Sequence, residues 1–187
     1  MPHYLDHNAT SPLIPAAREA MITALDAANT AAAHAAGQSA SMLVDSARMK
    51  VARLLGRDPR QVTFTSGATE ANATILRGLQ TPARSLVLTS AVEHPSVLGH
   101  ATHTVPVDER GVIELETLRE MVASLADELA VISVMAANNE TGVLQPMDAV
   151  AQIAQEAGIP LHCDATQLIG RLPVQLPDCW LTLSAHK

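Results

Sequence analysis

Aromatic residues are nearly missing from this sequence, which has one Phe, one Trp and one Tyr among 187 residues. Ala, Leu, Val and Ile therefore supply most of its apolar content, which is 48%. Ala-rich sequence with blocks of Leu and Val is typical of helices packed on a buried sheet. The length is that of one domain of ordinary size.

Basic stretches are missing too. The formal net charge is −7 and no run of Lys and Arg occurs, which argues against direct binding to nucleic acid or to an anionic membrane surface. The apolar runs are far shorter than the roughly 20 residues of a membrane span, and the first ten residues lack the pattern of a secretory signal. The two cysteines, Cys163 and Cys179, have no C-x-x-C or zinc spacing. We therefore expect a reduced, cytoplasmic protein.

Several familiar site motifs are absent as well. No G-x-G-x-x-G and no Walker lysine occur, so a dinucleotide or nucleoside triphosphate site is not indicated. No G-x-S-x-G of a serine hydrolase occurs either. His100 and His103 are three residues apart, but no acidic ligand converges on them, which favours a solvated loop and no metal site.

β-type and helical segments alternate along most of the chain. This alternation predicts an α/β fold of three layers, with a mostly parallel sheet flanked by helices on both faces. Ligands in such folds bind beyond the carboxyl ends of the strands. The expected strands are 62–65, 85–90, 102–107, 129–137, 159–164 and 180–184, and the expected longer helices are 12–28, 39–55, 67–79, 114–125 and 147–158.

The turn Ser66-Gly67-Ala68-Thr69 lies between an expected strand and an expected helix. Unpaired N–H groups and the positive end of a helix dipole bind phosphate at such a place, and the Thr69 hydroxyl would add a hydrogen bond. The alternative for this turn is an ordinary helix cap with no ligand.

Asp164 and Lys187 end two further apolar runs. A carboxylate at the tip of a buried strand needs a partner. A protonated pyridine nitrogen would be one, and the carboxylate would keep that ring an electron sink. A lysine in a polar cluster at a strand end can act as an amine nucleophile. The alternatives are a helix cap for Asp164 and a surface lysine for Lys187.

Three other polar groups follow strands. His94, after the expected strand 85–90, would stack on a flat ring or carry protons. Asn138 and Asn139 end the run 129–137, and Gln167 follows Asp164 by three residues. Each alone has a bland explanation as a loop, turn or helix residue. Their occurrence at successive strand ends favours one shared site.

Taken in order, these segments resemble the cysteine desulfurases, which are class V aminotransferase-type enzymes of the fold-type I pyridoxal 5′-phosphate (PLP) group. The resemblance runs from residue 4 to residue 187. The segments that carry it are YLDHNAT at 4–10, FTSGATEAN at 64–72, EHPSVL at 93–98, NNETGV at 138–143, HCDATQ at 162–167 and SAHK at 184–187.

The resemblance implies a role for each matching residue. Ala68 and Thr69 would hold the phosphate together with Ser184 and His186. His94 would stack on the pyridine ring and help to move protons. Asp164 would pair with the ring nitrogen. Gln167 and Asn139 would contact the ring hydroxyl and the substrate, and Lys187 would form the covalent bond to the cofactor.

The resemblance also implies a reaction and partners. L-cysteine would be the substrate, L-alanine the product, and an enzyme cysteine would take the sulfur for a sulfur-acceptor protein, in iron–sulfur cluster assembly or tRNA thiolation. The enzyme would be a homodimer. Related class V enzymes, such as selenocysteine lyases and aminotransferases, remain an alternative, as does a truncated relic without turnover.

The sequence departs from the family pattern in three ways. Family chains are about twice as long, so we expect residues 1–15 to form an N-terminal segment and 16–187 part of a PLP-binding large domain. The small C-terminal domain, the sulfur-accepting cysteine and a substrate-binding arginine would be absent, and the isolated chain would be inactive. Cys163 and Cys179 match no sulfur-accepting position, and Cys163 is expected to be inert core. The segment NTAAAHAAG keeps His34 but lacks a Pro-Ser-Ser-type stretch.

Overall fold

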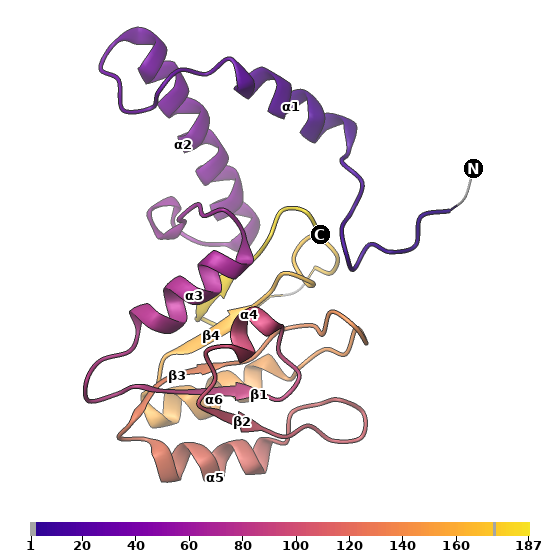
Figure 1. Ribbon diagram of the computed structural model, residues 1–187, viewed down its shortest axis with the longest axis vertical. Coiled ribbons are helices and arrows are strands. Elements are labelled where there is room, and N and C mark those ends of the chain that lie inside the picture. The colour runs from indigo at the N-terminus through magenta and orange to yellow at the C-terminus, as the bar shows by residue number, and fades with distance from the viewer. Residues whose placement is uncertain (1–2, 174) are drawn as a thin grey trace. The chain divides into compact units, whose positions relative to one another are not determined.

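The structure is a computed structural model that describes residues 3–173 and 175–187 (Figure 1). Its chain divides into two compact units. The first, here called the sheet unit, contains the described residues up to Thr10, those from Thr65 to Ala185, and Lys187. The second, the helical unit, contains Ser11–Phe64 and His186.

A parallel sheet of five strands forms the centre of the sheet unit, in the order β2-β1-β3-β4-β5. The chain adds β2 on one side of β1 and all later strands on the other side. The order therefore reverses between β1 and β3, which is where α/β sheets place ligand sites. The strands are β1 (Leu86–Ser90), β2 (His103–Val105), β3 (Leu129–Ser133), β4 (Leu161–Asp164) and β5 (Trp180–Thr182).

Helices cover both faces of this sheet (Figure 1). On one face, α5 (Leu115–Leu125) and α6 (Met147–Ala157) pack on strand residues such as Leu88 and Ile132. On the other, α3 (Ala68–Gly78) and the short α4 (Pro95–Leu98) contribute Leu76 and Val97 to a smaller core with Val131. The predicted α/β fold with a parallel sheet between helices is confirmed.

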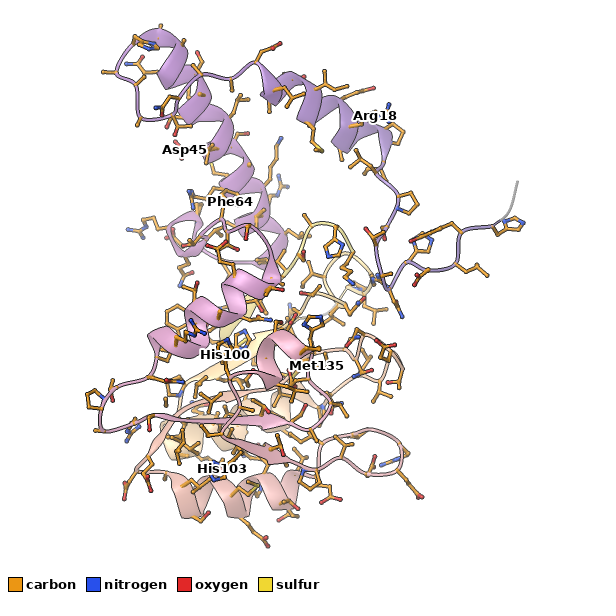
Figure 2. All side chains as sticks on the ribbon, in the orientation of Figure 1. Arg18, Asp45, Phe64, His100, His103 and Met135 are labelled. Atoms are coloured by element: carbon orange, nitrogen blue, oxygen red, sulfur yellow. The ribbon has the colours of Figure 1, made fainter. Side chains whose placement is uncertain are left out.

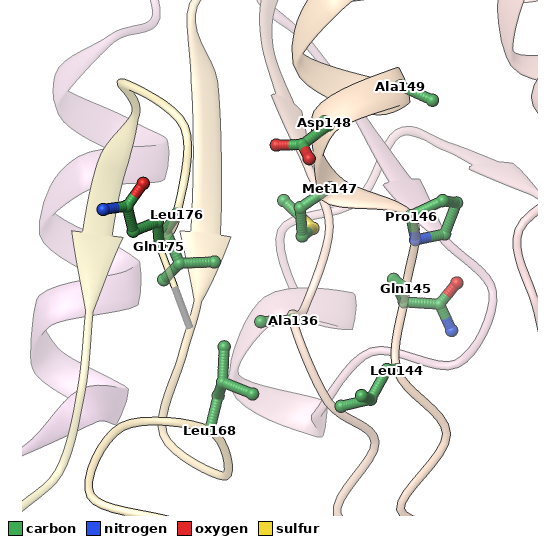
Figure 3. Close-up of a pocket in the computed structure, with 10 residues that line it drawn as sticks. All are labelled: Ala136, Leu144, Gln145, Pro146, Met147, Asp148, Ala149, Leu168, Gln175 and Leu176. Carbon is green, nitrogen blue, oxygen red and sulfur yellow. The ribbon is translucent and has the colours of Figure 1, made fainter. Parts of the chain in front are cut away.

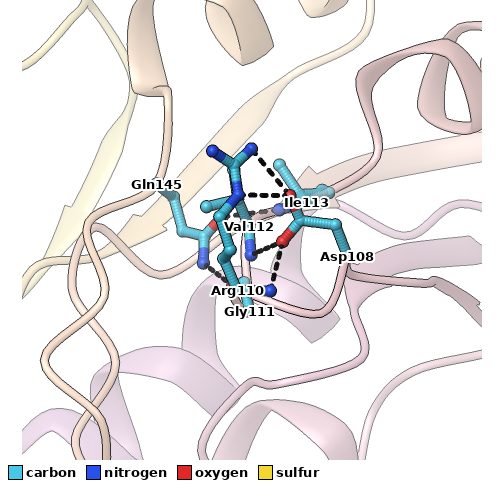
Figure 4. Close-up of polar contacts among 6 residues, drawn as sticks. All are labelled: Asp108, Arg110, Gly111, Val112, Ile113 and Gln145. Atoms are coloured by element: carbon cyan, nitrogen blue, oxygen red, sulfur yellow. Dashed lines mark hydrogen bonds and ion pairs between the residues drawn. The ribbon is translucent and has the colours of Figure 1, made fainter.

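One polar turn fixes the connection from β2 to α5 (Figure 4). The Asp108 carboxylate accepts hydrogen bonds from the backbone N–H groups of Arg110 and Val112, both at 2.9 Å. The buried Gln145 side chain accepts from Ile113 N–H at 2.9 Å and donates to the Gly111 carbonyl at 2.8 Å. Gly111 has a φ of 80°, which other residues rarely adopt. The turn is thus tied to the segment before α6.

The helical unit contains α1 (Pro15–Leu25), α2 (Ala35–Leu55) and the 3₁₀ turn η1 (Pro59–Gln61). His34 caps α2 by accepting from Gly37 N–H at 3.3 Å, and Gly56 ends the helix at a φ of 64°. A Cβ on Gly37 would lie 2.2 Å from the Ala32 carbonyl oxygen, so this position requires glycine. α1 has no buried residue.

The predicted strand 62–65 is wrong. Val62 has extended backbone angles, but no strand partner pairs with it among the residues that the structure describes. Arg48 of α2 bonds to this segment instead of a strand. Its guanidinium donates to the Val62 carbonyl and lies 5.2 Å from the centre of the Phe64 ring. A side chain, not a neighbouring strand, satisfies this segment.

No helix in the described part of the chain is long and apolar enough to cross a membrane.

Candidate active site at the carboxyl ends of the strands

Asp164, the last residue of β4, is buried at the carboxyl edge of the sheet. Its Oδ1 accepts from Thr166 N–H and its Oδ2 accepts from the side chain of Asn72, both at 3.0 Å. The carboxylate therefore has donors on both oxygens, as a buried charge requires.

Asn72 of α3 is fully buried and joins three elements. Its Nδ2 donates to Asp164 Oδ2 and to Ser96 Oγ, both at 3.0 Å. Its Oδ1 accepts from Thr182 Oγ1 of β5 at 2.6 Å. Sequence analysis did not identify Asn72, because an Asn within a helix has no local signal of function.

His162 extends this polar network into the sheet. Its Nε2 lies 3.1 Å from Thr182 Oγ1, and its Nδ1 lies 2.8 Å from Ser133 Oγ on β3. Burial lowers the pKa of His162 to about 4, against a smaller opposing effect of the Asp164 charge. The imidazole is therefore neutral at physiological pH and acts as a fixed element of the network.

His94 is the N-cap of α4 and is linked to Asn72 through the Ser96 side chain. Its Nδ1 is 2.7 Å from Ser96 Oγ and accepts from Ser96 N–H at 3.1 Å. Because Ser96 also accepts from Asn72, the structure joins His94 to Asp164 through two intervening side chains. The rest of the His94 ring is exposed and available to a ligand.

Glu93, next to His94, is buried and bridges the ends of β1 and β3. Its Oε1 accepts from Ser90 Oγ at 2.5 Å and from Met135 N–H at 2.7 Å, while its Oε2 has no partner in the described part of the chain. Burial raises the pKa of Glu93 to about 8, and the nearby Asp164 charge contributes in the same direction. Figure 2 labels Met135 in this region.

The Asn pair divides into a structural and an available residue. Asn138 is buried, donates to the Val92 carbonyl at 2.9 Å, and accepts from the N–H groups of Glu140 and Thr141. Asn139 is partly exposed and donates to Glu140 Oε1 at 2.7 Å. Asn138 therefore holds its turn against the loop that carries His94.

The predicted phosphate turn begins α3. Gly67 is the N-cap, no side chain caps the helix, and the Ser66 N–H donates to Glu70 at 2.6 Å. A Cβ on Gly67 would lie 4.0 Å from Ser184 Oγ. The Ser184 hydroxyl is thus close to the start of the helix that carries Ala68 and Thr69, as an anion site would require.

Lys187 and Gln167 meet at the N-terminal segment. The Lys187 ammonium and Gln167 Nε2 both donate to the Asn8 carbonyl, the latter at 3.0 Å. Arg171 donates to Asn8 Oδ1 at 2.9 Å and to the His7 carbonyl at 2.6 Å. Residues from both ends of the sheet unit therefore converge near Asp164. His186 belongs to the helical unit, where its carbonyl accepts from Ser11 N–H at 2.7 Å.

Two other features lie outside this arrangement. A mostly apolar hollow of about 360 Å³ opens beside the start of α6 (Figure 3), and none of the sequence-predicted site residues lines it. No three His, Cys, Asp or Glu side chains gather into a possible metal site in the described ranges. The hollow is lined by Ala136, Leu144, Gln145, Pro146, Met147, Asp148, Ala149, Leu168, Gln175 and Leu176.

His100 and His103 are both labelled in Figure 2. His100 precedes β2, and His103 is its first residue.

Comparison with known families decides which group this arrangement belongs to. The family model described as aminotransferase class-V matches residues 3–187. The chain belongs to this family. Class V relatives include the cysteine desulfurase of Sinorhizobium fredii, 40% identical over all of this chain and 52% of its own length. The cysteine desulfurase NifS of Azotobacter vinelandii is 38% identical over 98% of this chain and 49% of its own.

Solved structures of similar proteins share the fold. A NifS-like protein from Rickettsia africae matches with a TM-score of 0.87 and 30% identity, over 98% of this chain and 54% of its own. Another NifS-like protein matches with the same TM-score and 34% identity, over 100% of this chain and 55% of its own. The predicted resemblance is confirmed, and the class V chain spans about half the length of the curated relatives that it matches.

Proposed function

We propose that this chain supplies the cofactor-binding half of a PLP-dependent cysteine desulfurase. The observation that carries the proposal is the convergence of Asp164, Gln167 and Lys187 at one edge of the sheet, with His94 joined to Asp164 by hydrogen bonds. Relatives named cysteine desulfurase support the reaction.

The side chains at this edge fit PLP on three points. Two buried polar atoms beside Asp164, Thr166 Oγ1 and Gln167 Oε1, have no hydrogen-bond partner among the residues that the structure describes. An uncapped helix start with the Ser184 hydroxyl nearby suits a phosphate. Each oxygen of the Asp164 carboxylate accepts one hydrogen bond from the described residues, and a carboxylate oxygen can accept two. The carboxylate therefore has acceptor capacity left for a ring N–H.

The chain's own residues would then have distinct tasks. Ala68, Thr69 and Ser184 would bind the phosphate. Asp164 would hold the proton on the ring nitrogen, and Lys187 would supply the amine that bonds to the cofactor. PLP, when bound, supplies an electron sink for the carbon next to the substrate nitrogen.

Further residues would act on the substrate side. His94 would lie against the ring and hold or release a proton at its Nε2, because its Nδ1 is occupied by Ser96. Gln167 and Asn139 would contact the ring hydroxyl and L-cysteine. These roles follow the order of polar residues at the strand ends and stay proposals for this chain.

Neither cysteine of the chain matches the family's sulfur-accepting position, and the surroundings of Cys163 also argue against it. Cys163 is fully buried in β4, and the Cys179 thiol together with burial raises the pKa of Cys163 well above its ordinary value. A thiol must ionise to act as a nucleophile. We therefore propose that the sulfur-accepting cysteine of the complete enzyme is a different residue, which passes sulfur to an acceptor protein.

The cofactor proposal has a direct test, because the sequence has only two lysines, Lys50 and Lys187. The purified chain would be mixed with PLP, reduced with borohydride and mapped by mass spectrometry. We expect the trapped cofactor on Lys187 and complete loss of trapping in Lys187→Ala. Lys50→Ala, which changes an exposed lysine of the helical unit, is the matched control. Equal trapping in Lys187→Ala would overturn the assignment.

A second assay separates the reaction from cofactor binding. Alanine released from L-cysteine would be measured for the 187-residue chain, with L-selenocysteine as the competing substrate. We expect cofactor trapping without alanine release, because neither Cys163 nor Cys179 matches the family's sulfur-accepting position. Release from L-selenocysteine alone would favour a selenocysteine lyase instead.

A further inference from the structure

Asn72 occupies the only position on α3 from which one side chain contacts Asp164, Ser96 and Thr182 together, among the residues described. α3 also begins at the Gly67 turn, one helical turn before Asn72. The helix that would bind phosphate at its start therefore also holds the carboxylate that would face the ring nitrogen.

The direction of every hydrogen bond around Asn72 follows from Asp164. An ionised carboxylate only accepts, so the amide nitrogen of Asn72 must face it and the amide oxygen must face Thr182. Thr182 donates its single proton to Asn72, so it accepts from His162 Nε2–H. His162 Nδ1 then accepts from the Ser133 hydroxyl. The whole chain of bonds has one consistent direction.

The same logic reaches His94. Ser96 Oγ accepts from Asn72 Nδ2, and its proton is left for His94 Nδ1, which also accepts from Ser96 N–H. Neutral His94 must therefore carry its proton on Nε2. The Ser96 backbone N–H is enough to fix this tautomer. The tautomer of His162 does depend on Asn72, because without the Asn72 amide oxygen the Thr182 hydroxyl could turn and donate to His162 Nε2.

We propose that Asn72 is a positioning residue of the cofactor site, which fixes the Asp164 carboxylate directly and sets the tautomer of His162 through Thr182. The inference rests on the proposed function only in taking Asp164 as a contact of PLP. The hydrogen-bond arrangement itself exists in the chain without cofactor and can be measured there.

The first readout needs no cofactor. Nitrogen-15 NMR of the His162 imidazole distinguishes the two tautomers, and we expect the Nε2–H form to dominate in the wild type at neutral pH, where the His162 imidazole is neutral. Asn72→Ala should increase the Nδ1–H form at least severalfold, because the Thr182 hydroxyl can then donate to His162 Nε2. Thr74→Ala is the control, because this exposed hydroxyl of α3 bonds only to the Glu70 carbonyl within the helix.

The second readout is the dissociation constant of PLP, followed by absorbance. Asn72→Asp keeps the size of the side chain and its acceptor for Thr182, but turns a carboxylate toward Asp164. We expect the dissociation constant to rise about tenfold to a hundredfold, the range for losing a hydrogen bond to a charged group. Ser96→Ala leaves the bonds of Asn72 to Asp164 and Thr182 in place, and should leave the dissociation constant within about threefold of wild type.

The outcomes separate the two proposals. If wild type traps PLP on Lys187 but Asn72→Asp binds it with wild-type affinity, the positioning role is wrong and the proposed function stands. If wild type binds no PLP while Asn72→Ala still changes the His162 tautomer, the network is supported and the proposed function fails. If Asn72 variants do not fold by circular dichroism, a His162 that carries its proton on Nδ1 in the wild type overturns the proposal.

Discussion

The sheet unit buries its apolar side chains, whereas much of the helical unit leaves them exposed. Leu88, Val131 and Ile132 have no exposed surface, but Leu25 of α1 is 81% exposed and no residue of α1 is buried. Buried polar groups, by contrast, lie in the sheet unit, where Asn72 bonds to Asp164 and is linked to His162 through Thr182. The sheet unit thus has the core and the candidate site, while the helical unit has an uncovered apolar surface.

Truncating one large apolar residue in each unit is the strongest test of this contrast. Leu88→Ala removes a fully buried side chain of β1, and we expect it to lower the free energy of unfolding by about 2–5 kcal/mol. Met21→Ala on α1, where the side chain is exposed, should change it by less than about 0.5 kcal/mol. Urea unfolding followed by circular dichroism would measure both. Similar costs for the two variants would mean that the two units are equally packed.

The buried ionisable groups of the sheet unit should give its stability a marked pH dependence. Glu93 has a pKa raised from 4.5 to about 8, so the folded chain holds this proton more tightly than the unfolded chain does. Its contribution is complete below pH 4.5 and is lost as the pH rises to about 8. His162 has a pKa lowered from 6.5 to about 4, so its contribution is complete above pH 6.5 and is lost as the pH falls to about 4.

These two effects cancel between pH 4.5 and 6.5, and only the Glu93 effect remains above that range. Each proton contributes about 1.4 kcal/mol per pH unit, so the free energy of unfolding should fall by about 2 kcal/mol between pH 6.5 and 8. Glu93→Gln keeps an acceptor for Ser90 and Met135 but cannot ionise, and should flatten this slope. A slope that is unchanged in Glu93→Gln would assign the dependence to another group.

The sequence predicts the sheet unit better than its buried polar network. Apolar runs followed by polar residues identified the strand ends, and with them Asp164, Gln167 and His94. Asn72 was missed because the segment around it resembles an ordinary exposed helix. Its one signal is the spacing to Leu76, four residues later on the same helical face, which is also buried. His162 and Thr182 were missed because polar residues inside short strands give no pattern of their own.

Errors of extent have a similar cause. The apolar run 129–137 predicts a long strand, but β3 ends at Ser133. Beyond it the backbone turns toward other partners, since Met135 N–H donates to Glu93 and Asn138 N–H donates to the Val143 carbonyl. Burial without sheet pairing produces the same apolar sequence as a strand. The predicted strand 62–65 failed for a different reason, because its β-branched residues are mostly exposed and a side chain of α2 bonds to the Val62 carbonyl.

Substitutions on the exposed apolar surface of α1 should have the smallest effect on the free energy of unfolding and a specific effect on association. Ile14, Met21 and Leu25 lie along one side of the helix, and all three are exposed. We propose that a second copy of the chain covers this stripe in a homodimer. Leu25→Glu would place a charge in the contact, and sedimentation should then give a monomer at concentrations where the wild type is a dimer.

The control for this variant lies on the same helix. Ala20 is exposed and lies about 140° around the helix axis from Leu25, so Ala20→Glu adds an equal charge away from the stripe and should leave the dimer intact. At dilutions where every variant is a monomer, both substitutions should change the free energy of unfolding by less than about 0.5 kcal/mol. Leu25→Glu would then weaken association without weakening the fold. This is expected if the apolar stripe is covered by a partner and not by the core of the same chain. A Leu25→Glu chain that sediments as the wild type does would remove α1 from the proposed interface.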